Sequence, residues 1–155
     1  MPENISPHCT YKQATQSQTA TRLGLTNEPG HKELTAMKLV AAACYEPAVA
    51  HFGPIPISSF FRSHKVNAAI GGALTSQHID GEAMDLDLGN RNTDLLKWLR
   101  ANTPFDQIIS EYEDSHGVPS WVHVSHKATG NRGAVLRAIR INGKTVYRPY
   151  DVRPA

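Results

Sequence analysis

Apolar positions recur at helical spacing in three parts of the chain. The longest such stretch runs from about residue 32 to 45, and Pro47 is expected either to bend it or to start a second short turn. Ser63 can cap a short helix over residues 64–69. Either Asn92 or Thr93 can cap a helix that ends near residue 102. The polar residues 5–24 predict a short helix or an extended arm packed on the domain.

Alternation of apolar and polar residues predicts strands in the later part of the chain. In MDLDL (84–88), Met84, Leu86 and Leu88 share one face while Asp85 and Asp87 share the other. This pattern is typical of a half-buried strand that carries carboxylates on its open face.

Other strands are expected at 54–62, 105–112 and 121–126. Residues 134–150 read AVLRAIRI-NG-KTVYRPY, which predicts a C-terminal hairpin with a type I′ turn at Asn142-Gly143. Helices early and strands late indicate an α+β fold, with a mostly antiparallel sheet and flanking helices. We expect one domain over residues 1–155, with 1–10 as a poorly ordered arm, and a monomer.

Composition narrows the possible partners. The net charge is only +2 and there is no long basic run, so nucleic acid is not expected as a partner. No window is apolar enough for a membrane span, and the N-terminal segment MPENISPHCTYKQ has no signal-peptide core. We therefore expect a protein that is cytoplasmic as synthesised. Cys9 and Cys44 are expected as buried thiols rather than as a disulfide.

Three residues suggest a metal centre: His78, Asp85 and His123. Two imidazoles and one carboxylate suit Zn²⁺, and a set of three protein ligands leaves a position open for water or substrate. The six residues between His78 and Asp85 fit a loop ligand followed by a strand ligand, with Gly81 turning the backbone between them. If the three side chains converge, the site is one for hydrolysis.

The neighbouring residues suggest supporting roles. Trp121 shares a strand face with His123, and its bulk can wall a substrate pocket. Asp87 shares a face with Asp85 and is a candidate for orienting a ligand histidine. Ser76 can bond either the ligand loop or the substrate.

The string TSQHIDGEAMDLDL resembles the S-x-H-x-x-G-x-A-x-D signature of the zinc murein peptidases, and WVHVS (121–125) is similar to their second element. That family includes D-Ala-D-Ala carboxypeptidases and phage L-alanyl-D-glutamate endopeptidases. The resemblance extends over roughly residues 10–135, and the N-terminal part is similar to the phage and prophage subgroup.

The resemblance implies the small α+β fold of the Hedgehog signalling domain and one Zn²⁺ held by His78, Asp85 and His123. It implies an endolysin-like peptidase that acts on the stem peptide of peptidoglycan, after release or as a virion component. It further implies that Arg62 binds the substrate beside the metal. It leaves open which murein bond is cut.

The general base departs from the family pattern. Several relatives carry a carboxylate three residues before the last ligand, where this chain has Ser120. Glu111, on the preceding strand, is the first choice for the base, because the phage-like subgroup resembles this chain there. Other candidates lie in the following loop: Glu113, Asp114 and His116.

Two alternatives remain beside the enzyme. Ser120 favours a catalytically silent zinc module that binds a cell-wall peptide or a protein partner. The other alternative is a structural phage component with a vestigial site.

Overall fold

A six-stranded mixed sheet forms the centre of the computed structural model, which describes residues 4–151. The strand order is β1-β2-β4-β3-β5-β6. The strands are β1 (Ile57–Ser59), β2 (Ala83–Leu86), β3 (Gln107–Glu111), β4 (Trp121–Ser125), β5 (Ala134–Ile141) and β6 (Lys144–Pro149). With helices packed around this sheet, the expected α+β class is confirmed.

Most of the strand pairs are antiparallel, as expected, but β3 and β5 are parallel. The chain leaves β4, crosses to the far side of β3 through residues 126–133 and returns in the direction of β3. The predicted hairpin is present as β5 and β6, with positive φ angles of 52° at Asn142 and 76° at Gly143. These are the backbone conformations that a type I′ turn requires.

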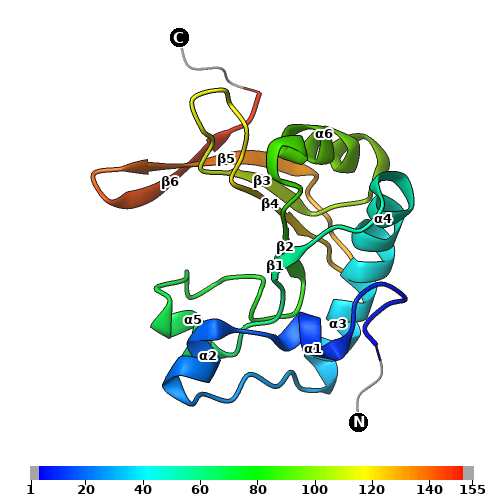
Figure 1. The fold of residues 1–155 in the computed structure, drawn as a ribbon, viewed down its shortest axis with the longest axis vertical. Helices are drawn as coiled ribbons and strands as arrows, with labels where there is room; N and C mark the ends of the chain where they lie inside the picture. Colours follow the sequence, from blue (N-terminus) through cyan, green and yellow to red (C-terminus); the bar gives the residue numbers. More distant parts are fainter. Residues whose placement is uncertain (1–3, 152–155) are drawn as a thin grey trace.

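The helices lie around this sheet in two groups (Figure 1). Their bounds are α1 (Tyr11–Thr15), α2 (Gln18–Leu23), α3 (His31–Val40), α4 (Glu46–Phe52), α5 (His64–Ala69) and α6 (Asn92–Asn102). Helices α3, α4 and α6 pack along the sheet, whereas α1, α2 and α5 gather beyond the β1 edge. No helix within residues 4–151 is long and apolar enough to cross a membrane.

The helix expected over 32–45 continues to Phe52, past Pro47, where a bend or a second short turn was expected. A π-helical turn, Ala41–Tyr45, joins α3 to α4, and Pro47 is the second residue of α4. Proline has no N–H, and its ring crowds the carbonyl four residues back, so a widened turn lets the helix pass this residue.

The N-terminal segment differs from the expected loose arm. Ile5 and Cys9 are buried in the core, and the Ser6 hydroxyl donates to Glu46 Oε2 at 2.6 Å. The His8 N–H donates to the same oxygen at 2.9 Å. Residues 4–10 are therefore fixed against the start of α4, while 1–3 lie outside the described residues. Cys9 and Cys44 are free, buried thiols, as predicted.

Two helix starts were predicted, and one of them is wrong. Ser63 caps α5 by accepting from the Val66 N–H. Helix α6 instead follows a 3₁₀ turn, Gly89–Arg91, with no side-chain cap. The buried Asn92 accepts from the Leu88 N–H and donates to the Pro119 carbonyl, so it joins two loops.

One face of the sheet packs into the hydrophobic core, and the other face carries Asp85 and His123. Met84, Val124 and Ile108 lie side by side across β2, β4 and β3 and belong to the main hydrophobic core. On the opposite face, Asp85 lies beside His123. The alternation of MDLDL is therefore confirmed, but Asp85 is buried rather than on an open face, because His78, from the loop before β2, lies against its carboxylate. Strand β2 also ends at Leu86, before Asp87.

Gly81 has the positive φ angle, 75°, that the turn between the first two ligands requires. A Cβ atom at this position would lie 2.5 Å from the Glu33 carbonyl oxygen of α3. Gly81 thus sets how closely the ligand loop packs on α3.

We predict that Gly81→Ala destabilises the fold more than Gly130→Ala does. Gly130 has nearly the same φ angle, 73°, but open space around it. Each change costs about 1–2 kcal/mol for the left-handed backbone, and overpacking against α3 adds about 1–3 kcal/mol at Gly81 alone. Urea denaturation of both variants measures the difference. Equal losses would show that the contact with α3 does not constrain this loop.

Candidate metal centre

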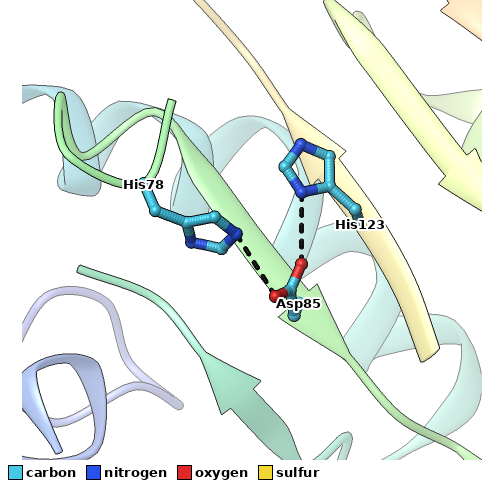
Figure 2. Close-up of side chains that lie close together, drawn as sticks. All are labelled: His78, Asp85 and His123. Carbon is cyan, nitrogen blue, oxygen red and sulfur yellow. Dashed lines mark hydrogen bonds and ion pairs between the residues drawn. The ribbon is translucent and has the colours of Figure 1, made fainter. Parts of the chain in front are cut away.

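The central strand pair brings two of the three predicted ligands together. Asp85 on β2 and His123 on β4 are direct cross-strand partners, so their side chains leave the same face of the sheet. His78 reaches them from the loop that leads into β2. Figure 2 shows both imidazoles pointing toward the Asp85 carboxylate.

The distances suit a single small cation. His78 Nε2 lies 3.2 Å from Asp85 Oδ2, and His123 Nδ1 lies 3.1 Å from Asp85 Oδ1. One ligand atom from each residue can be chosen so that all three lie within 4.8 Å of one another. A tetrahedral centre with bonds of about 2.0–2.1 Å has ligand-to-ligand edges of about 3.3 Å. The observed spacing is therefore close to what such an ion requires.

The protonation state of His78 also fits a metal ligand. Its Nδ1 lies 2.6 Å from the carbonyl oxygen of Phe60, and a carbonyl only accepts hydrogen bonds, so Nδ1 carries the proton. Nε2 is then left with a free lone pair. That atom is buried and has no hydrogen-bond partner within the described part of the chain. An unpartnered buried nitrogen of this kind is what a metal ion would satisfy.

The carboxylate of Asp85 is held in its charged form. Burial on its own would raise its pKa, but the two imidazoles beside it, His78 first and then His123, lower the pKa of this carboxyl well below its ordinary value. A deprotonated carboxylate is the form that binds a cation.

Glu111 lies next to this group on the same face of the sheet. It is the direct partner of Trp121, and the next pair on that face is Ile109 and His123. Glu111 is only 8% exposed, and its burial raises the pKa to about 7, against an opposing effect of the His123 charge. A carboxyl group that titrates near neutral pH can both accept and return a proton.

Arg62 lies close enough to the same centre to be affected by the charges of Asp85 and Glu111. Its backbone N–H donates to the His78 carbonyl at 3.2 Å, which fixes it beside the ligand loop. Burial lowers its pKa, whereas the charges of Asp85 and Glu111 raise it. Nη1 donates to Asn67 Oδ1 at 3.3 Å, and the buried Nε has no partner within residues 4–151. The guanidinium therefore keeps a free donor close to the metal ligands.

The other predicted site residues have mixed outcomes. Ser76 Oγ accepts from the His78 N–H at 3.3 Å, so it supports the ligand loop. Trp121 packs edge-on against Tyr112, with ring centroids 5.5 Å apart. Asp87 does not orient a histidine: its described partners are the Gly89 N–H and Asn92 Nδ2. The carbonyl oxygen of Phe60 orients His78 instead.

Two of the loop residues considered as the general base, Glu113 and Asp114, form hydrogen bonds away from the candidate metal ligands. Glu113 bonds Ser110 and Arg137, which extend from the core-side face of the sheet. Asp114 accepts from the N–H groups of His116 and Val118 and so closes its own loop. Among the acids weighed for this role, Glu111 alone shares the face of the ligands.

Two groups that support the site, the Phe60 carbonyl and Asn67, were not predicted from the sequence. The orienting oxygen of Phe60 belongs to the backbone, so no side-chain pattern reveals it. Asn67, which bonds Arg62 and the Ala73 carbonyl, depends on a close approach to Gly72 that only the folded chain shows. A Cβ atom on Gly72 would lie 2.3 Å from Asn67 Oδ1.

Comparison with known families supports the same assignment. The model of a family described as peptidase M15 matches residues 7–125. The match includes His78, Asp85, Glu111 and His123, and it stops before the β5–β6 hairpin. No curated protein matched the chain.

The donor set predicts binding of one divalent ion per chain. With Zn²⁺ as the probe, we expect the metal-free protein to take up one equivalent and to gain thermal stability, because binding favours the folded state. Asp85→Ala should weaken binding by more than tenfold. Asp87→Ala, which removes a carboxylate two residues away, should retain it. Calorimetric titration measures both, and an unchanged affinity in Asp85→Ala would contradict the assignment.

The raised pKa of Glu111 predicts a pH-dependent stability. The folded metal-free protein holds a proton on Glu111 up to about pH 7, whereas the ordinary value is 4.5. This group therefore favours folding below its ordinary pKa, and the benefit is lost as pH rises through 7. Relative to wild type, Glu111→Gln should be more stable at pH 8 than at pH 4 by about 3 kcal/mol. Urea denaturation at both pH values tests this, and a difference independent of pH would contradict it.

Proposed function

The chain belongs to the peptidase M15 family, which acts on peptide bonds, and on that premise we propose that it is a zinc-dependent peptidase of the peptidoglycan stem peptide. The observation that carries the proposal is the convergence of His78, Asp85 and His123 beside a buried carboxyl group with a pKa near neutral. A metal site with a purely structural role does not need a carboxyl group that transfers protons beside it.

The residues that would hold Zn²⁺ are His78, Asp85 and His123. When bound, Zn²⁺ would act as a Lewis acid toward the scissile carbonyl and make a water molecule more acidic. Three protein ligands leave room for that chemistry, whereas structural zinc sites fill all four positions with protein.

Glu111 is the group proposed to move protons. Its carboxylate takes a proton from the attacking water and returns it to the leaving amine nitrogen. The Ser120 hydroxyl, at the position where several relatives carry an acid, donates to the Tyr112 carbonyl at 2.9 Å. Glu111 approaches from the neighbouring strand, so the base does not need to occupy position 120.

Arg62 is proposed to bind the substrate oxygen on which negative charge develops. Its guanidinium is partly buried, stays charged, and keeps a donor free of protein partners among the described residues. In a site with little water, such a donor stabilises a tetrahedral oxyanion more strongly than it would in solution.

Peptidoglycan as substrate rests on the family, whose members act on its peptides. The resemblance of the N-terminal segment to phage and prophage enzymes supports an endolysin-like role at the cell wall. D,D-carboxypeptidase and endopeptidase activities both fit the site described, and the product identifies the bond.

The test is digestion of purified peptidoglycan, followed by mass spectrometry of the released muropeptides. We expect new peptide termini that disappear when the metal is chelated and return with added Zn²⁺. Glu111→Gln should lower the rate by about 10²–10⁴-fold, the usual contribution of a general base, and should keep its zinc. Glu113→Gln, a neighbouring acid bound to Arg137, should keep most of the activity.

Two outcomes would contradict this proposal. Zinc binding without any cleavage would favour the silent module that Ser120 suggested. Cleavage that survives Glu111→Gln would move the proton transfer to another group.

A further inference from the structure

The C-terminal hairpin has a tyrosine on the face of the sheet that carries the metal ligands. In the register of the sheet, Trp121 pairs with Glu111, Glu111 with Ala138, and Ala138 with Tyr147. Directly paired residues project from the same face. Tyr147 is therefore in one row with Glu111, two strands away, and Figure 1 shows its hairpin extending on the same side of the molecule as α5.

The distance across this row can be spanned by the side chains. Neighbouring strands lie about 4.8 Å apart, so the backbones of Glu111 and Tyr147 are separated by about 10 Å. Ala138 lies between them and contributes only a methyl group, which is fully buried. The long side chains of Tyr147 and Glu111 can thus approach each other above Ala138.

The charged groups of the candidate site also act on the Tyr147 hydroxyl, in agreement with its place in this row. Partial burial raises its pKa, and the charges of Glu111, Tyr112 and Asp85 raise it further, while Arg62 opposes them. The phenol therefore remains protonated at neutral pH and available as a donor.

That donor has no partner within the described residues. Two other tyrosine hydroxyls have partners: that of Tyr112 bonds Thr145, and that of Tyr45 donates to the Ile55 carbonyl. Tyr147 is 53% exposed and makes no such bond within residues 4–151. A half-exposed ring beside charged catalytic groups, with a free hydroxyl, is suited to a ligand rather than to the core.

We propose that Tyr147 is a substrate-binding residue, whose hydroxyl donates a hydrogen bond to a carbonyl oxygen of the bound stem peptide. The inference rests on the proposed function and extends it to the hairpin, which the family match does not include. Glu111 and Tyr147 then border the bound peptide on the β6 side, and Arg62 borders it on the α5 side.

The test compares Tyr147→Phe with Tyr150→Phe. Tyr150 follows β6 directly, but its ring packs on the main core and under the Arg137 guanidinium, so this control removes a hydroxyl on the other side of the sheet. Both variants should keep the wild-type zinc content and thermal stability. We expect kcat/KM on a soluble stem pentapeptide ending in D-Ala-D-Ala to fall about 3- to 10-fold or more in Tyr147→Phe, the value of one neutral hydrogen bond, and to stay within about twofold in Tyr150→Phe.

A binding measurement separates this inference from the proposed function. In the zinc-loaded Glu111→Gln background, which should turn over about 10²–10⁴-fold more slowly, calorimetry gives the affinity for the same pentapeptide with and without Tyr147→Phe. A loss of about 3- to 10-fold is expected. If wild type cleaves and Tyr147→Phe matches it in both rate and affinity, the inference is overturned while the proposed function stands. If the protein binds the peptide but releases no new termini from the peptide or from peptidoglycan, the proposed function fails and the affinity comparison still decides on Tyr147. If the protein neither binds the peptide nor cleaves peptidoglycan, both proposals fall.

Discussion

Asp85 lies between His78 and His123 because β2 and β4 pair in one register, with Asp85 directly opposite His123. A slip of one residue would turn Asp85 into the core and Met84 toward the histidines, since side chains alternate along a strand. The apolar partners on the other face, among them Met84 and Val124, prevent that slip by their own burial. The core and the candidate metal centre are thus fixed by the same pairing.

Without a cation, the site contains buried polar atoms that are not compensated. The Nε2 atoms of His78 and His123 have no hydrogen-bond partner among the described residues. The buried carboxyl of Glu111 adds a further cost when it is ionised. Such groups are tolerated where function requires them, and well-packed neighbours compensate. Here the fully buried strand residues Leu86, Val122 and Ile108 supply that packing.

Local pattern was sufficient for much of this molecule. The alternation of MDLDL and WVHVS placed Asp85 and His123 on definite faces, and the Asn142-Gly143 turn defined the hairpin register. Other features depend on distant parts of the chain. Asn92 was predicted to cap a helix, but its side chain donates to the Pro119 carbonyl instead. The residues near Asn92 in the sequence give no sign of this contact with the loop that contains Pro119. The parallel pairing of β3 with β5 likewise depends on a crossover, so the placement of Tyr147 beside Glu111 emerged only from the assembled sheet.

The β5–β6 hairpin joins the rest of the sheet along one border only, that of β5 with β3, and its tip turns at Asn142-Gly143. A hairpin at the edge of a sheet can change in length or sequence at its turn without disturbing the pairing of the central strands. The metal ligands come from the interior of the sheet and from the loop before β2. This architecture separates the candidate metal ligands from an edge hairpin, so the hairpin could change in length or sequence without moving His78, Asp85 or His123.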